Sequence, residues 1–276
     1  MSKVWFVTGS SRGLGRALAE AVLASGDQLV ATARRPEQLD TLVQRYSGQV
    51  RTVALDVTDP GAARRAVALG LETFGRLDVL VNNAGYADVA SIEDLTEDGF
   101  RAQIDTNFYG VVNVTRAALP AMRERGAGHI VQISSIGGRI GSPGLGAYQA
   151  AKWAVGGFSE VLAKEVAPFG IKVTLIEPGG MRTDWAGSSM STPPISDPYK
   201  PVIGPVVEFL DRHNGTQSGD PARAAQAVIR ATEADEPPMH LLLGSDAVAI
   251  AADAAQDLAS SDAAWRALSE SADFPA

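Results

Sequence analysis

The chain has 276 residues, of which 45% are hydrophobic and 20% charged, and its formal net charge is −8. An acidic chain of this kind is poorly suited to nucleic acid or to an acidic membrane surface, so neither is expected as a partner. It has no cysteine, and its three histidines lie in separate segments, so disulfides and cysteine chemistry are excluded and no metal site is expected.

Short apolar runs alternate with amphipathic segments along most of the chain. Strands are expected at 3–8, 28–33, 50–55, 77–81, 129–134, 172–176 and 239–243, and helices at 13–25, from Pro36, at 61–74, 96–125 and 147–168, and after Asp220. Strands alternating with helices form right-handed crossovers. The pattern therefore predicts a doubly wound α/β fold, with a parallel sheet of about seven strands covered by helices on both faces. No linker interrupts the series, so residues 1–276 are expected to form one domain.

The alternation breaks at residues 184–220, where Ser, Pro and Gly surround an apolar patch at 202–210. This segment follows the sixth strand, at the edge where open α/β sheets bind ligands. We interpret it as a lid with one small helix, and an ordinary mobile loop is the alternative. Residues 246–276 are alanine-rich and predict a helical tail. No apolar stretch has the length of a membrane span, which favours a cytoplasmic protein.

A glycine-rich turn joins the first strand to the first helix, in the run Thr8-Gly9-Ser10-Ser11-Arg12-Gly13-Leu14-Gly15. Its glycines allow a sharp turn and close approach to a pyrophosphate, and the helix N-terminus offers free N–H groups. The second strand contains no acid that could bind the ribose hydroxyls of NAD, and it ends in Arg34-Arg35. The guanidinium groups of Arg12 and Arg34 suit the 2′-phosphate of NADP, whereas Arg35 could equally be a solvated loop residue. NADP is therefore the expected cofactor.

Tyr148 and Lys152 lie four residues apart on a predicted helix, which places both side chains on one face. An ordinary tyrosine ionises near pH ~10, and a neighbouring ammonium favours its phenolate form. The pair is therefore expected to lower the pKa of Tyr148 toward the range where it can transfer a proton at neutral pH.

Seven motifs in this order resemble those of the short-chain dehydrogenase/reductase superfamily, in its single-domain branch. They are Thr8-Gly9-x-x-x-Gly13-x-Gly15, Asp56-Val57, Asn82-Asn83-Ala84-Gly85, Asn107, Ser134-Ser135, Tyr148-x-x-x-Lys152 and Pro178-Gly179. The resemblance covers residues 3–183. It implies a Rossmann fold and an enzyme that oxidises an alcohol or reduces a carbonyl group with a nicotinamide cofactor.

The resemblance also implies a role for each matching residue. Tyr148 would give the proton to the carbonyl oxygen, and Ser135, favoured over Ser134 by its spacing, would hydrogen-bond the same oxygen. Lys152 would hold the nicotinamide ribose and lower the pKa of Tyr148, and Asn107 would interrupt its helix and position a relay water. Cofactor contacts are expected at Gly9, Ser11, Arg12, Gly13, Leu14, Gly15, Arg34, Arg35, Asp56, Val57, Asn83, Ala84, Gly85, Tyr148, Lys152, Pro178, Gly179, Met181 and Thr183. For Asn82, bracing of neighbouring strands is at least as strongly expected as a cofactor contact.

The substrate would lie over the nicotinamide, between the segments that follow the fifth and sixth strands. Its expected contacts are Ser135, Ile136, Tyr148, Gly180, Trp185 and Met190, with Met181 and Phe209 as further wall candidates. Trp185 could instead anchor the lid to the core. Because these side chains are mainly apolar and bulky, a neutral, hydrophobic ketone, aldehyde or secondary alcohol is the expected small-molecule partner.

The leading hypothesis is thus an NADP-dependent carbonyl reductase or alcohol dehydrogenase. One alternative is an NAD-dependent alcohol dehydrogenase that works in the oxidative direction. Another is a non-catalytic NADP-binding sensor, which would not need a proton donor. Residues 241–247 lack the Asp-Gly-Gly ending common in the family's tetramers, so a homodimer or a monomer is expected rather than a tetramer.

Overall fold

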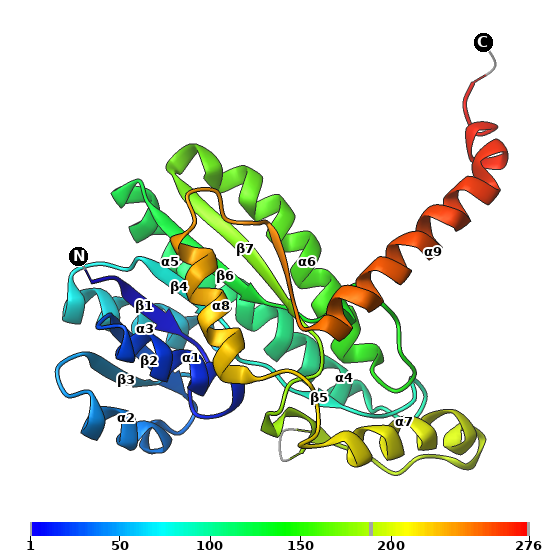
Figure 1. The fold of residues 1–276 in the computed structure, drawn as a ribbon, viewed down its shortest axis with the longest axis horizontal. Helices are drawn as coiled ribbons and strands as arrows, with labels where there is room; N and C mark the ends of the chain where they lie inside the picture. Colours follow the sequence, from blue (N-terminus) through cyan, green and yellow to red (C-terminus); the bar gives the residue numbers. More distant parts are fainter. Residues whose placement is uncertain (1, 188–189, 275–276) are drawn as a thin grey trace.

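The computed structural model describes residues 2–187 and 190–274 (Figure 1). Within these residues seven parallel strands form one sheet, in the order β3-β2-β1-β4-β6-β7-β9. The strands are β1 (Val4–Val7), β2 (Gln28–Ala33), β3 (Val50–Ala54), β4 (Val79–Asn82), β6 (Gly128–Ile133), β7 (Ile171–Pro178) and β9 (His240–Leu243). The chain winds outward from β1 to β3 and then from β4 to β9, so the predicted doubly wound fold is confirmed.

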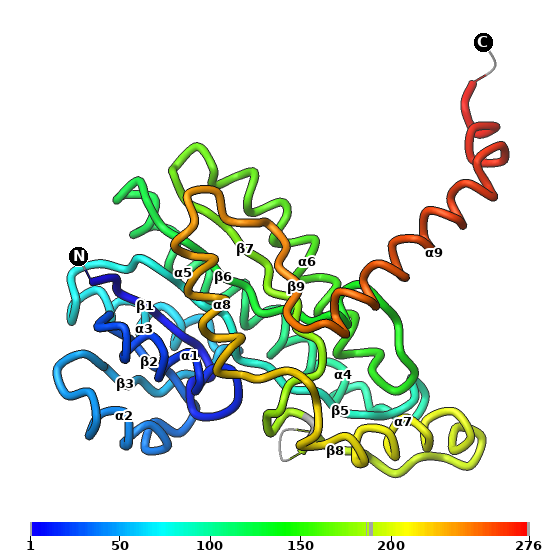
Figure 2. The backbone as a smooth tube through the Cα atoms, in the orientation of Figure 1, coloured from blue at the N-terminus to red at the C-terminus, as the bar shows by residue number. Residues whose placement is uncertain are grey.

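Helices cover both faces of this sheet (Figures 1 and 2). One face packs against α1 (Gly13–Ala24), α2 (Asp40–Arg45) and α8 (Pro221–Glu233), and the other against α3 (Pro60–Phe74), α5 (Gly110–Arg125) and α6 (Gly146–Val166). Along β1, Trp5 and Val7 belong to the first core and Phe6 to the second. Because successive strand residues point to opposite faces, a strand buried on both sides must be apolar throughout, as β1 is.

The predicted helix over 96–125 contains an interruption. It consists of α4 (Glu97–Ile104), a π-helical turn (Asp105–Tyr109) and then α5. The π turn holds Asn107 at its centre, in agreement with the interruption that the family resemblance implied. Wide turns of this kind occur mostly at functional sites.

The segment predicted as a lid is joined to the body by a second, two-stranded sheet. β8 (Met190–Ser191) pairs in parallel with β5 (Ala87–Asp88), which follows β4. The Ser191 hydroxyl donates to Asp88 Oδ1 at 2.5 Å. Residues 188–189 of the predicted lid lie outside the described residues.

The helix of this segment, α7 (Lys200–His213), is longer than the predicted patch at 202–210. Gly204 and Pro205 weaken the helical pattern in the sequence. Ile203 is 2% exposed and lies, with Val89, beside Gly144. The predicted small helix is therefore present, and tertiary packing of Ile203 helps to stabilise it over a greater length than the apolar patch.

The predicted helical tail is α9 (Ser245–Glu270), which projects away from the body (Figures 1 and 2). Ala247 and Ala251 are its buried residues, while Trp265 and Leu268, farther along, are each 64% exposed. Residues 275–276 of the predicted tail are outside the described part of the chain. Among the described helices, none is both long and apolar enough to cross a membrane.

Candidate active site

The predicted phosphate loop has the backbone that its glycines were expected to permit. Gly9 and Gly13 have φ angles of +67° and +56°, in the left-handed region that glycine tolerates. A Cβ atom on Gly15 would lie 2.3 Å from the carbonyl oxygen of Gly9, so no side chain fits there. Helix α1 begins at Gly13 with Arg12 as its N-cap; that residue's side chain makes no capping hydrogen bond, and the first turn contains no acid. These features fit an anion at the helix N-terminus.

Asn83, which directly follows β4, holds the glycine-rich loop in place through its side chain. The Asn83 amide nitrogen Nδ2 donates to the carbonyl oxygens of Thr8 and Gly9, at 3.0 and 3.1 Å. Asn82 donates to Gln132 Oε1 on neighbouring β6 at 2.9 Å, which matches the bracing expected as one of its two roles. Asn83 therefore shapes the groove through its side chain, and its predicted cofactor contact stays a prediction.

Arg12 and Arg34, the residues expected to bind the 2′-phosphate, and Arg35, for which a solvated loop position is equally expected, are all exposed. Arg34 and Arg35 directly follow β2, and Arg12 lies in the glycine loop. Burial and Asp88 raise the pKa of Tyr86, and Arg34 is near enough to oppose that rise. Arg34 thus lies near the loop after β4, and the binding of an adenosine phosphate by these arginines stays a prediction.

Asp56 and Val57 follow β3 at this edge. The Asp56 Oδ1 atom accepts hydrogen bonds from the Thr58 amide and hydroxyl, at 3.0 and 2.7 Å. Val57 is 7% exposed and packs in the core, where a Cβ on Gly110 would lie 2.5 Å from its Cγ2. The Asp56 carboxylate is therefore exposed to solvent, and one of its two oxygens is hydrogen-bonded to Thr58 in the turn after β3.

Ser135, Tyr148 and Lys152 are brought together at the carboxyl end of β6. The Ser135 side chain is close enough to Tyr148 to lower the pKa of its phenol, and it accepts a hydrogen bond from the Gly137 amide at 3.0 Å. The Lys152 ammonium nitrogen lies 5.6 Å from the centroid of the Tyr148 ring. The rival Ser134 instead donates its hydroxyl to the backbone oxygen of Lys152, at 3.3 Å. Ser135 is therefore the serine that contacts the tyrosine.

Asn107 builds the π turn beside this group. Its Nδ2 donates to the carbonyl oxygens of Tyr86 and Gln103, both at 2.9 Å, and its Oδ1 accepts from the Tyr86 amide at 3.1 Å. A Cβ on Gly85 would lie 2.5 Å from Asn107 Oδ1 and 3.7 Å from Lys152 Nζ. Asn107 thus packs the loop after β4 against the lysine, and its relay of a water stays a prediction.

Burial is the main influence on the pKa values of Tyr148 and Lys152. It raises the pKa of Tyr148 to about 12, against a smaller opposing effect of the Ser135 hydrogen bond, and it lowers the pKa of Lys152 to about 8. The Trp185 ring covers Tyr148, with centroids 5.3 Å apart, and Lys152 Nζ donates to the Ile133 oxygen at 2.8 Å. The predicted lowering of the pKa of Tyr148 is therefore wrong for this structure, because desolvation favours the neutral phenol.

The segment after β7 returns to the phosphate loop. The Gly179 amide donates to the Leu243 oxygen at 2.9 Å, which fixes the exit from Pro178. A Cβ on Gly13 would lie 3.3 Å from Thr183 Cβ, so Thr183 sits against the loop that follows β1. Two segments far apart in the sequence, the one after β7 and the one after β1, therefore meet at this end of the sheet, and their contacts with a dinucleotide stay a prediction.

One of the predicted substrate contacts, Trp185, lies against Tyr148, and two others lie in neighbouring segments. Trp185 packs on its ring, and Ile136 follows Ser135 and is half-buried. Met190 pairs with Ala87 in the small sheet, so β8 places it beside the segment after β4. Trp185 belongs to the lid segment and packs on the tyrosine, as an anchor of the lid would, and its contact with a substrate stays a prediction.

Two other candidates lie farther from the tyrosine. Phe209 is 57% exposed, and its ring centroid lies 4.1 Å from that of His213, so its role as a wall of the substrate site stays a prediction. Helix α7 turns this residue outward, a direction that the sequence does not specify. Met181 forms an isolated backbone bridge with Gly219, which holds the segment after β7 at its far end.

A buried ion pair beside the site was not predicted from the sequence. Glu177, 2% exposed in β7, accepts from Arg139 Nε at 2.7 Å and pairs through its other oxygen with the same guanidinium. This pairing raises the pKa of Arg139. His240 Nδ1 lies 3.2 Å from Glu177 Oε2. The available signal was an acid inside an otherwise apolar strand, since a buried carboxylate needs a partner.

Comparison with known proteins gives consistent matches. A family model described as short chain dehydrogenase matches residues 3–193. Oxidoreductase BOA17 of Botryotinia fuckeliana is 55% identical over 270 residues, covering 98% of each chain. The crystal structure of a short-chain dehydrogenase from Streptomyces avermitilis is 41% identical, with a TM-score of 0.92 and 99% of each chain covered. An alcohol dehydrogenase from the archaeon Thermococcus sibiricus, solved with 5-hydroxy-NADP, is 27% identical, with a TM-score of 0.72 and coverage of 88% and 96%.

Proposed function

The chain belongs to the short-chain dehydrogenase family, and we propose that it is an NADP-dependent oxidoreductase acting between NADPH and a mainly hydrophobic ketone, aldehyde or secondary alcohol. One observation carries the proposal: the buried contact of Ser135 with Tyr148, beside Lys152, at the sheet edge that also bears the glycine loop. A sensor that only binds the cofactor would need the loop and not the proton donor.

The residues present fit a nicotinamide dinucleotide. When bound, such a cofactor supplies the hydride. The first turn of α1 and the Arg12 guanidinium would hold its phosphates, and Thr183 would face it across the groove. Lys152 would hold the ribose through its ammonium group, because its pKa of about 8 keeps most of it protonated at neutral pH.

Tyr148 is the proton donor in this proposal. Its pKa of about 12 keeps the proton on Oη at neutral pH, so the phenol can hydrogen-bond a carbonyl oxygen and transfer the proton as charge develops there. Ser135 fixes the direction of that hydroxyl and offers a second hydrogen bond to the same oxygen. Trp185 covers the ring and limits the access of water.

The choice of NADP rests on charge at the end of β2. Arg34 follows the strand where NAD-specific sites place an acid, and Arg12 lies across from it in the glycine loop. A guanidinium pairs with a phosphate through two parallel hydrogen bonds. The archaeal structure solved with 5-hydroxy-NADP shows that this fold accepts a phosphorylated cofactor, although another structure of the same fold was solved with NAD.

The substrate class rests on the apolar surroundings of Tyr148. Trp185 of the lid packs on its ring, and Ile136 and Met190 lie in the loop after β6 and in β8, the segments expected to surround the substrate. The cation closest to Ser135 in sequence, Arg139, is neutralised by Glu177. We therefore propose a neutral carbonyl compound rather than a carboxylated or phosphorylated one.

The test is NADPH oxidation by the purified protein against ketones and aldehydes graded by size and polarity. We expect turnover with apolar carbonyls, and a loss of about 10²–10⁴-fold in Tyr148→Phe with NADPH binding retained, since only the proton donor is removed. Tyr109→Phe, at a tyrosine that is 52% exposed, is the matched control. Unchanged turnover in Tyr148→Phe would reject the mechanism, and a preference for NADH in alcohol oxidation would support the oxidative alternative.

A further inference from the structure

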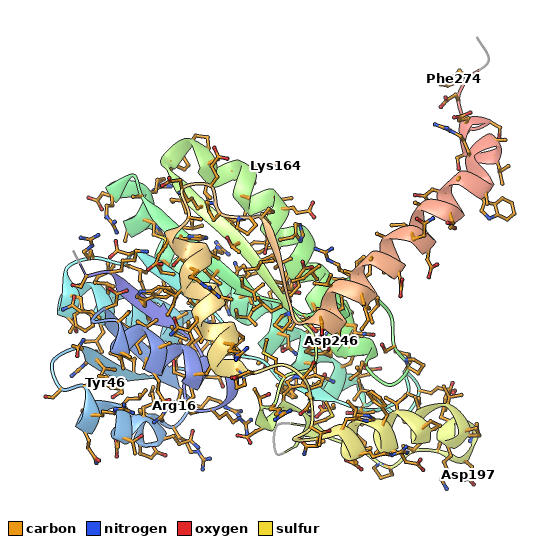
Figure 3. All side chains as sticks on the ribbon, in the orientation of Figure 1. Arg16, Tyr46, Lys164, Asp197, Asp246 and Phe274 are labelled. Carbon is orange, nitrogen blue, oxygen red and sulfur yellow. The ribbon has the colours of Figure 1, made fainter. Side chains whose placement is uncertain are left out.

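Helix α9 begins inside the candidate site, although most of it projects into solvent. Gly244 is its N-cap and Asp246 lies in its first turn. Figure 3 places Asp246 at the root of the helix, next to the body, and Phe274 at the far end of the chain. Ala247 and Ala251 are buried against the body, whereas Phe274 is 99% exposed. The first turn is therefore the part of this segment that can act on the site.

The Asp246 carboxylate sits in a cradle of glycines at the end of β7. Its Oδ2 accepts a hydrogen bond from the Gly180 amide at 2.7 Å. A Cβ on Gly179 would lie 2.4 Å from both carboxylate oxygens, and one on Gly244 would lie 2.5 Å from Oδ1. Such distances are shorter than side chains tolerate, so the carboxylate reaches the backbone only because these positions lack a Cβ.

The contact with Asp246 adds to two backbone hydrogen bonds that hold the same pair of glycines. The Gly179 amide donates to the Leu243 oxygen at 2.9 Å, and the Gly180 oxygen accepts from the Gly219 amide at 3.1 Å. Asp246 Oδ2 holds the remaining amide, that of Gly180, between those two bonds. Two consecutive glycines have a large conformational freedom, and three hydrogen bonds remove it.

The position of Asp246 in its helix explains how a partly buried carboxylate is tolerated there. Its Oδ1 is buried, with no hydrogen-bond partner among the described residues. A buried carboxylate oxygen without a partner costs free energy. The first turn of a helix carries the positive end of the helix dipole, which offsets part of that cost. The placement of Asp246 in the first turn of α9 thus explains how a carboxylate is tolerated so close to the backbone.

We propose that Asp246 is a positioning residue for the cofactor groove. By holding Gly179 and Gly180 it sets the path of the segment that leads to Thr183, which lies against Gly13 of the phosphate loop. This proposal rests on the proposed function for its effect on catalysis, whereas the effect on backbone order belongs to the protein alone. It makes the start of the C-terminal helix part of the nicotinamide side of the site.

The experiment compares Asp246→Ala, Asp246→Asn and the matched control Asp253→Ala, an exposed aspartate two turns farther along the same helix. Amide hydrogen exchange of residues 179–183 is measured without cofactor, NADPH dissociation by fluorescence titration, and kcat and KM with the best carbonyl of the panel. Asp246→Ala should exchange faster at Gly180 and lose about tenfold in NADPH affinity, as expected from one lost hydrogen bond to a charged group.

Asp246→Asn should stay close to the wild type in both measurements, because its amide oxygen can accept from the Gly180 amide. Asp253→Ala should match the wild type. If Asp246→Ala does not fold, Gly179→Ala provides the second test, since its methyl group would displace the intact carboxylate and should give the same local exchange. Unchanged exchange and NADPH affinity in the folded variant would overturn the proposal. A wild type with no turnover would reject the proposed function, while exchange and NADPH binding would still decide the role of Asp246.

Discussion

Lys152 donates a hydrogen bond from its ammonium nitrogen to the backbone oxygen of Ile133, 2.8 Å away at the end of β6. The lysine is 4% exposed, and a carbonyl oxygen is a neutral acceptor rather than a counter-charge. Burial therefore prevails, and it lowers the pKa of Lys152 to about 8. The residue that is to hold the cofactor ribose is thus close to losing its charge at mildly alkaline pH.

The first prediction is a decline of reductive kcat/KM as the pH rises through about 8. Lys152 is an ammonium below its pKa and a neutral amine above it, so its charged form disappears as the pH rises. Tyr148, with a pKa of about 12, keeps its proton throughout this range. A pH series from 6 to 10 measures the decline, and the residual activity of Lys152→Arg should not show it, because guanidinium stays protonated. A flat wild-type profile would contradict the assignment.

The second prediction concerns Arg34. Replacing it with aspartate removes a cation and places an acid where NAD-specific sites carry one, so the preference for NADPH over NADH should fall by at least about tenfold. The ratio of kcat/KM for the two cofactors measures this change. Arg101→Asp, at an exposed arginine of α4, is a control for the altered net charge. An unchanged ratio in Arg34→Asp would show that the cofactor phosphate binds elsewhere.

The third prediction tests the buried ion pair of Glu177 with Arg139. Glu177→Gln should destabilise the protein by about 2 kcal/mol, below the full effect of breaking a buried pair because Arg139 is partly exposed. It should also lower kcat, since Arg139 closes the turn that follows Ser135. Urea unfolding and steady-state kinetics measure both effects.

Glu20→Gln is the matched control for that experiment. It breaks a surface ion pair with Arg16, in which the Glu20 side chain is 45% exposed. The free energy of unfolding should fall by less than about 1 kcal/mol. Equal losses of stability in Glu177→Gln and Glu20→Gln would mean that the buried ion pair stabilises the protein no more than a surface pair does.

The fourth prediction concerns acid stability. Burial, aided by Lys172 and Lys3, lowers the pKa of His129 to about 4, from 6.5 in a model peptide. Between these pH values the unfolded chain binds the proton and the folded chain does not, so the free energy of unfolding should fall as the pH drops through this window. The contribution of His129 is up to about 3 kcal/mol. Urea unfolding at pH 7 and pH 4.5 should show a smaller difference in His129→Gln than in the wild type.

His213→Gln is the control for the acid series, because His213 is exposed on α7. It should keep the wild-type pH dependence. If both variants behave alike, the acid sensitivity arises from the carboxylates of the protein rather than from His129.

The sequence was sufficient for features that depend on local spacing. Gly9 and Gly13 revealed a turn with positive φ, and the spacing of Tyr148 from Lys152 placed both on one face of α6. The strand bounds lie within two residues of those predicted. Each of these features is determined by neighbouring residues along the chain.

Features that depend on burial could not be predicted in this way. The pKa of Tyr148 is set by desolvation, and Trp185, which covers its ring, belongs to another segment. The direction of Phe209 depends on how α7 packs through Ile203. Asp246 gave no signal at all, because the glycines that admit it lie after β7, far away in the sequence.

The projecting helix α9 has two parts: its first turn, beside the body, which we call the root, and the exposed length beyond Ala251, which we call the shaft. At the root, a substitution of Asp246 is an active-site substitution, even though Tyr148 lies far upstream. Along the shaft, the exposed residues beyond Ala251 contact little of the body. Substitutions at exposed positions of the shaft should therefore change neither stability nor the catalytic edge appreciably, whereas substitutions in the first turn should change both.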